Sequence, residues 1–218
     1  MSRYLLLALL LLVAAVALAP AYAENFPPPG TTAFNVEVSV GADLLNEQGQ
    51  LPAWYMDDGS GTTSITHSAV YVNESGYRYI NNSMAGFSGT GTWHFYDGTL
   101  YGPATVTLPG ASGEMTSQGL PEGDFPADSF FDVFVTIQTP VGTFHTADLV
   151  HLTGAAGTFS NHRVDGGSVA LYGEGGAWAG NLSHLGLYFT PIPEPSSLLA
   201  LGSGLLPLGF ALRRRIKR

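Results

Sequence analysis

The chain of 218 residues contains no cysteine, and it contains very few basic residues away from its two ends. The absence of cysteine excludes disulfides, thiolate metal sites and thiol catalysis, so the protein must be stable through packing alone. Within residues 24–190 the basic residues are Arg78 and Arg163, set against 16 Asp and Glu, which gives a net charge of about −14. Such a surface repels a phosphate backbone, so we expect no nucleic-acid partner.

The N-terminus has the parts of a secretory signal peptide. A positively charged start and a short apolar run precede a small-x-small cleavage site at Ala21 and Ala23, directly before Glu24. An apolar run of this length is more typical of a removed signal than of a permanent membrane anchor. We therefore expect signal peptidase to remove residues 1–23.

The C-terminal segment, residues 191–218, combines a proline-flanked acid, an apolar run and a basic end. The apolar run at 196–212 would span roughly 25 Å as a helix, slightly less than a hydrocarbon core of about 30 Å. It therefore predicts a marginal, temporary transmembrane helix. The basic end resists translocation, which places residues 24–190 outside the cytoplasm. The basic residues of this end are Arg213, Arg214, Arg215, Lys217 and Arg218.

Pro193, Glu194 and Pro195, followed by the apolar run and the terminal arginines, resemble the PEP-CTERM sorting signal of Gram-negative bacteria. The resemblance covers about residues 192–218. It implies that an integral-membrane exosortase recognises the motif and processes the tail, in a bacterium that makes exopolysaccharide, biofilm or floc. It also implies that the protein is held briefly in the inner membrane, with its domain in the periplasm, before delivery to the cell surface or extracellular matrix.

Residues 24–190 consist of short apolar segments separated by glycine and proline. Apolar and polar residues alternate over 34–40 and again over 185–189, as in half-buried strands. Eight or more such segments with regular turns, and no βαβ alternation, predict a single all-β domain, an antiparallel β-sandwich or jelly roll. A signal-peptide helix and a C-terminal hydrophobic helix would flank it. Residues 42–47 favour one isolated helical turn.

No motif identifies a catalytic residue in this domain. The histidines form no HExxH pattern, and His145 and His151 would lie about 20 Å apart on a continuous strand, too far apart to share a metal. The segment around Ser88 departs from the GxSxG nucleophile elbow at its last position. A catalytic triad is defined by space rather than by sequence order, so hydrolysis stays open as an alternative.

Acidic residues offer two further hypotheses. Four of them near residues 121–132 could act as the paired carboxylates of a glycosidase, although a solvated polar loop explains them more simply. Residues 57–61 and 122–124 offer the oxygen donors that calcium needs, without the spacing of an EF-hand, and ordinary turns explain them as well. We expect no obligatory cofactor and keep calcium as the alternative. The four acids are Glu122, Asp124, Asp128 and Asp132, and the first calcium segment is Asp57-Asp58-Gly59-Ser60-Gly61.

Aromatic residues at 54–55, 93–96 and 178 could stack on sugars or could fill the core. Together these features favour a non-catalytic surface or matrix protein that binds or scaffolds extracellular polysaccharide. The expected partners are signal peptidase, an exosortase-type enzyme, the membrane through the C-terminal helix, and extracellular polysaccharide. The alternative is a secreted enzyme that hydrolyses polysaccharide or ester groups on a β-sandwich scaffold.

Overall fold

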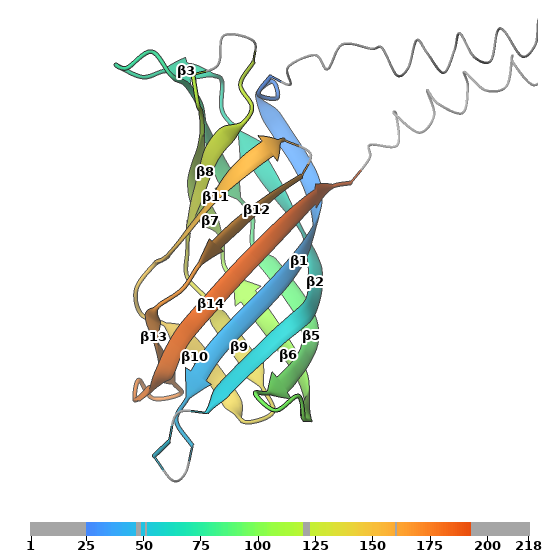
Figure 1. Cartoon of the computed structure of the whole chain (residues 1–218), viewed down its shortest axis with the longest axis vertical. Helices are drawn as coiled ribbons and strands as arrows, with labels where there is room; N and C mark the ends of the chain where they lie inside the picture. Colours follow the sequence, from blue (N-terminus) through green and yellow to red (C-terminus); the bar gives the residue numbers. More distant parts are fainter. Residues whose placement is uncertain (1–24, 47–48, 51, 120–122, 160, 193–218) are drawn as a thin grey trace, which may run out of the picture.

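The computed structural model describes residues 25–46, 49–50, 52–119, 123–159 and 161–192 (Figure 1). Within these ranges the regular structure is entirely β-strand with antiparallel pairing, which confirms the predicted all-β fold. The same ranges contain no helix that is long and apolar enough to cross a membrane. The predicted signal peptide at 1–23 and the sorting segment from residue 193 onward lie outside the described residues.

Three long strands extend over the length of the domain, and most of the others form pairs that continue one another after a kink (Figure 1). The long strands are β1 (Gly30–Leu44), β2 (Ala53–His67) and β14 (Trp178–Pro191). The pairs are β4 (Arg78–Met84) with β5 (Phe87–Phe95), β6 (Leu100–Leu108) with β7 (Ala111–Ser117), β8 (Ala127–Val133) with β9 (Thr136–Thr139), β10 (Gly142–Thr146) with β11 (Val150–Thr158), and β12 (Asn161–Gly166) with β13 (Val169–Gly173). The short β3 (Tyr71–Val72) pairs with β4.

The sheet closes on itself, because β1 pairs with both β2 and β14. β2 pairs with β4 and with β5, and β14 pairs with β12 and with β13, so two rings of strands share β1, β2 and β14. The upper ring in Figure 1 is completed by β4, β7, β8, β11 and β12, and the lower ring by β5, β6, β9, β10 and β13. Opposite walls face each other across the core, as the layers of a β-sandwich do.

The predicted alternation places the apolar side chains inside. Phe34 and the valines that follow it on β1 are buried, and so are Leu185, Leu187 and Phe189 on β14. The predicted helical turn at 42–47 is wrong: Ala42, Asp43 and Leu44 continue β1 and pair with β14. Ladder hydrogen bonds to two neighbouring strands outweigh a weak local helix preference at these positions.

Several glycine and proline signals mark kinks inside long strands rather than hairpin turns. Pro109-Gly110 joins β6 to β7, and Asp58-Gly59 lies within β2. By contrast, Asp97-Gly98 and Gly175-Gly176 form true turns, in which Gly98, Gly175 and Gly176 adopt the positive φ angles that favour glycine. The local sequence therefore locates breaks in the strand pattern, while the neighbouring strands decide whether the chain bends or reverses.

Candidate functional site

A pocket of about 490 Å³ opens at the free end of the lower ring, where β1 ends and β2 begins. The loop between β9 and β10 and the start of β6 complete its walls. Its lining residues are mostly apolar or aromatic, and the Asn46 amide and the Tyr101 hydroxyl are its polar side-chain groups. The lining residues are Leu44, Leu45, Asn46, Trp54, Tyr101, Val141 and Phe144.

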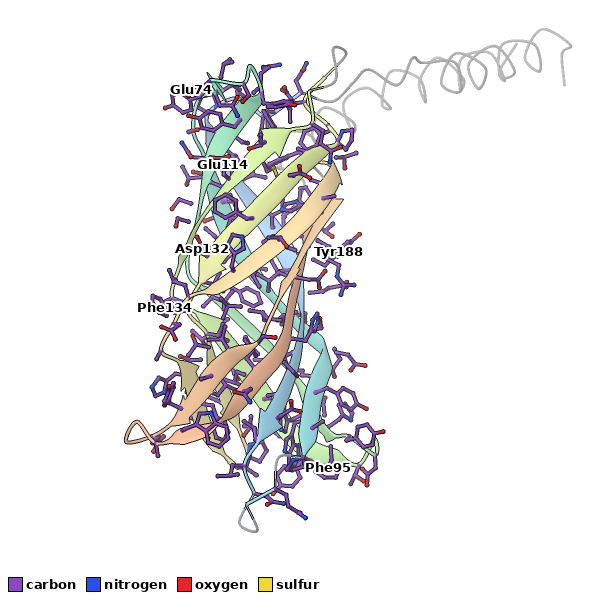
Figure 2. The ribbon with its side chains drawn as sticks, turned by 60° about the vertical axis from the view of Figure 1, so that its left-hand side comes forward. Glu74, Phe95, Glu114, Asp132, Phe134 and Tyr188 are labelled. Atoms are coloured by element: carbon purple, nitrogen blue, oxygen red, sulfur yellow. The ribbon has the colours of Figure 1, made fainter. Side chains whose placement is uncertain are left out.

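Trp54 is the centre of the aromatic contacts in this pocket. Its indole ring stacks on buried Trp93 with 6.1 Å between ring centroids and 11° between planes. Phe95 and Tyr101 meet Trp54 edge-on, with centroids 4.8 and 5.0 Å away. Tyr101 is half exposed, whereas Trp54 is more buried, so the tyrosine offers the more accessible ring. Figure 2 shows Phe95 at this end of the molecule.

The polar side of the pocket belongs to the β1–β2 connection. The Asn46 amide nitrogen donates to the Gln50 side-chain carbonyl at 3.2 Å, and the Gln50 backbone N–H donates to the Asn46 side-chain oxygen at 2.8 Å. These contacts orient the Asn46 side chain at the mouth of the pocket. A concave apolar surface with a few placed polar groups is the usual form of a small-molecule site.

The other predicted aromatic residues are scattered. Trp93 is fully buried in the core, while Tyr55 lies on the outer surface of the adjacent strand. Tyr96 is 78% exposed in the β5–β6 turn, and Trp178 is 45% exposed at the start of β14. Because successive residues of a strand face opposite sides, the run 93–96 cannot act as one stacking surface.

Of the four acids proposed as glycosidase carboxylates, the three in the described part of the chain do not form a common site. Asp124 is almost completely buried, pairs with Arg78 at 2.9 Å and accepts a hydrogen bond from the Phe26 backbone N–H at 2.8 Å. Asp128 and Asp132 lie on the outer side of β8, where Asp128 accepts from Gln118 and Asp132 contacts His151 (Figure 2). Glu122 lies outside the described residues.

The first calcium segment does not form the loop that the sequence suggested. Residues 57–61 belong to strand β2, and Gly59 leaves room for the inward-facing side chains of Met56 and Val38. The outward carboxylates of this segment are those of Asp57 and Asp58. In the second segment, Asp124 already forms the contacts with Arg78 and Phe26 described above.

Four of the histidines differ in their strand and in their burial. His145 lies on β10 and His151 on β11, so they are on two strand segments rather than on one continuous strand. His67 and His162 are buried inside the upper ring. Burial lowers the pKa of His162 to about 4, although a hydrogen bond with the Phe159 backbone opposes this shift.

One constellation that the sequence did not indicate lies on the outer face of β1, β14 and β12. Ser39 Oγ and His184 Nε2 are 3.0 Å apart, within hydrogen-bond distance. Asp165 Oδ1 is 3.8 Å from the same nitrogen. A catalytic triad instead needs the carboxylate at the other ring nitrogen, where it fixes the tautomer. These residues are far apart in the chain, so no local motif could have revealed the group.

A shallow groove of about 260 Å³ runs beside this constellation. Arg163 lies in the groove and donates two hydrogen bonds of 2.8 Å to Asp165, one from Nε and one from Nη2. The groove residues include Glu37, Ser39, Asp57, Arg163 and Tyr188, the last of which is labelled on the outer surface in Figure 2.

The residues predicted for export and sorting cannot be placed. The cleavage site at Ala21, Ala23 and Glu24, the motif at 193–195 and the basic end at 213–218 all lie outside the described residues. Their assignment therefore remains a prediction from the sequence.

Comparisons with known proteins show a similar fold and no family. No protein-family model and no curated protein matches the chain. Among solved structures, the chain is similar to DynF from the dynemicin biosynthesis pathway of Micromonospora chersina, with a TM-score of 0.58 and 15% sequence identity. The match covers 81% of this chain and 92% of DynF. At this identity the likeness concerns the fold alone.

Proposed function

We propose that this chain is an exported cell-surface or extracellular-matrix protein, sorted by an exosortase-type system, whose β-domain binds saccharide of the exopolysaccharide layer without converting it. The pocket that contains Trp54 and Tyr101 is the observation that carries the binding role. The PEP-CTERM resemblance of residues 192–218 supports the sorting role.

The chemistry of the pocket suits a sugar. Aromatic rings offer flat apolar faces to the C–H side of a pyranose, while the Asn46 amide can exchange hydrogen bonds with hydroxyl groups. The acidic surface of residues 24–190 repels anionic chains. The proposal therefore favours neutral saccharides, and an acidic polysaccharide would need a bridging cation such as Ca²⁺.

The position of the pocket also suits a tail-anchored protein. Ile192 lies beside the start of β1, because its backbone N–H donates to the Ala33 carbonyl at 2.8 Å. Strand β1 runs from there to the opposite end of the domain (Figure 1). The pocket lies at that opposite end, where Leu44 ends β1. A strand of this length spans about 45 Å. A protein held through its C-terminal tail would thus present the pocket away from the membrane.

The binding role is tested with a glycan array and with native exopolysaccharide, each with and without Ca²⁺, using the protein as its host processes it. Tyr101→Ala should weaken retention roughly five- to tenfold, because it removes the exposed ring of the pocket. Tyr71→Ala is the matched control, since Tyr71 is equally exposed on β3 at the opposite end. No retention of the wild type under any condition would contradict the proposal.

Ser39 and His184 favour a second candidate function, hydrolysis of ester or glycosidic bonds. Ser39 Oγ lies 3.0 Å from His184 Nε2, the distance at which a histidine can accept the proton of a serine nucleophile. The adjacent groove could hold a substrate. Activity on a panel of esters and polysaccharides that disappears in Ser39→Ala would establish this function. Equal activity in wild type and Ser39→Ala would remove it.

A further inference from the structure

β2 has one more residue than its neighbours at Asp57 and Asp58. Val38 pairs with Gly59 and Val40 with Met56, so Ser39 alone stands opposite these two aspartates. The pairing with β5 shifts over the same stretch. A β-bulge redirects side chains, and this one turns two successive carboxylates outward while Met56 and Gly59 both remain buried.

The bulge brings the two carboxylates next to a histidine of the adjacent strand. His94 on β5 stands opposite Tyr55 in the ladder, and their rings stack with centroids 5.1 Å apart and planes 14° apart. Asp58 accepts hydrogen bonds from the Thr92 backbone N–H at 2.7 Å and from its hydroxyl at 2.8 Å.

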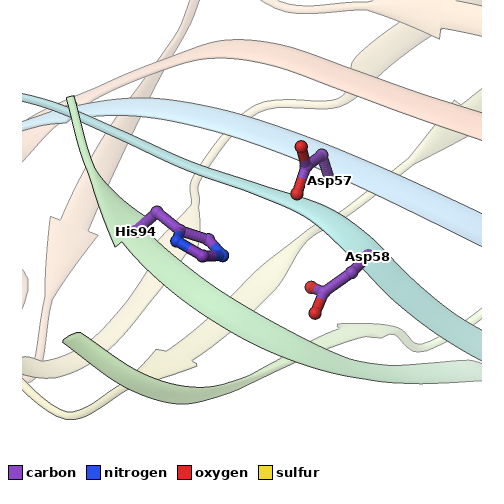
Figure 3. A group of neighbouring side chains, drawn as sticks. All are labelled: Asp57, Asp58 and His94. Atoms are coloured by element: carbon purple, nitrogen blue, oxygen red, sulfur yellow. The ribbon is translucent and has the colours of Figure 1, made fainter. Parts of the chain in front are cut away.

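The three side chains form a mixed nitrogen and oxygen donor set. Asp57, Asp58 and His94 each offer one ligand atom, and these atoms lie within 4.8 Å of one another (Figure 3). In the described part of the chain, the two arginines pair with other acids, Arg78 with Asp124 and Arg163 with Asp165. Neither arginine forms an ion pair with Asp57 or Asp58 there.

A separate observation is the space beside this donor set. Asp57 also lines the groove that contains Arg163 and Tyr188. A cation on Asp57 would therefore lie at the rim of a hollow rather than under a covering loop. Water or an oxygen-bearing ligand could complete its coordination from that side.

We propose that Asp57, Asp58 and His94 bind a divalent transition metal, with Zn²⁺ as the representative ion. One imidazole and two carboxylates suit zinc and its neighbours in the first transition row, whereas calcium takes oxygen ligands almost exclusively. Three protein ligands and an open position are typical of zinc sites that act on a further ligand. Ligands of one zinc ion lie roughly 3–4 Å apart, so the exposed Asp57 side chain has to rotate toward Asp58 and His94 to close the site.

The test measures zinc alone, on the purified protein as its host processes it. Bound metal is counted after dialysis, and affinity is measured by competition with a chelating dye. Wild type should take up one Zn²⁺ per chain, and Asp57→Asn should bind it at least about tenfold more weakly. His94→Phe should do the same while keeping the ring stack with Tyr55, which separates loss of a ligand from loss of packing.

The controls use matched residues outside the cluster. His145→Phe removes a histidine that also contacts a tyrosine ring, that of Tyr172, and Asp148→Asn removes an exposed acid. Both should bind zinc as the wild type does. The proposal is overturned if wild type binds no zinc, if His94→Phe binds as tightly as wild type, or if Ca²⁺ displaces zinc at equal concentration.

Discussion

His162 stacks on Phe189 in the upper ring, with 4.7 Å between ring centroids and 13° between planes. Phe34 and Phe159 also contact the His162 ring, so aromatic groups surround it. Burial is the largest cause of its lowered pKa, and nearby His67 lowers it further. A hydrogen bond with the Phe159 backbone opposes this shift, but burial outweighs it. We therefore expect this packing to make the domain sensitive to acid.

The first prediction concerns stability against pH. The pKa of His162 is about 4 in the folded protein, against 6.5 for an ordinary histidine. Between these values the unfolded chain binds the proton and the folded chain does not, so stability falls as pH decreases from about 6.5 to 4. The loss is about 3 kcal/mol. Urea unfolding of wild type across this range measures it.

The matched variant is His162→Phe, which keeps the aromatic stack and removes the titrating group. Its stability should vary less between pH 6.5 and 4 than that of the wild type. His145→Gln changes a histidine outside the core and should leave the wild-type dependence in place. An equally steep loss in His162→Phe would show that other groups cause the acid sensitivity.

The second prediction concerns Asp124, which the sequence suggested as a catalytic acid. Because Asp124 pairs with Arg78 and accepts from the Phe26 N–H, Asp124→Asn should reduce the free energy of unfolding by about 2 kcal/mol. Asp128→Asn changes an exposed acid nearby and should cost less than about 0.5 kcal/mol. If Asp124→Asn is as stable as the wild type but loses a hydrolytic activity, Asp124 is a catalytic residue rather than a structural one.

The third prediction compares two glycines of β11. A methyl group at Gly154 would collide with the Arg163 carbonyl oxygen of β12, whereas at Gly157 it would meet nothing within 4 Å. Gly154→Ala should therefore destabilise the protein by about 2 kcal/mol or more, and Gly157→Ala should be neutral or slightly stabilising. Thermal unfolding measures both. Similar melting temperatures for the two variants would contradict this account of the β11–β12 contact.

The fourth prediction concerns the sorting motif. If an exosortase reads the extended segment between Pro193 and Pro195, Glu194→Ala should leave the tail unprocessed and the protein in the membrane fraction. Mass spectrometry and cell fractionation in a host with that enzyme measure the outcome. Asp148→Asn is a suitable control, because it removes an acid from the domain and leaves the tail unchanged. Normal processing of Glu194→Ala would remove the PEP-CTERM assignment.

Parts of the candidate sites were visible in the sequence. Trp54 was among the predicted stacking aromatics, and Asp57 and Asp58 were among the predicted oxygen donors. The sequence did not indicate that Tyr101 lies near Trp54, or that His94 lies near Asp57 and Asp58. These residues are on different strands, and which strands pair depends on the whole sheet. The expectation that residues 57–61 form a loop failed because Asp-Gly is also tolerated at a bulge, and the local pattern does not distinguish the two.

The sequence by itself determined which side chains face the core, because alternation along a strand is a local property. The buried positions between residues 34 and 40 and between 185 and 189 could be predicted from this alternation. Only the tertiary structure decided that β1 pairs with β14, which closes the sheet and brings Ser39 to His184 across 145 residues of chain. That choice depends on the register and packing of all strands together, and no short segment contains this information.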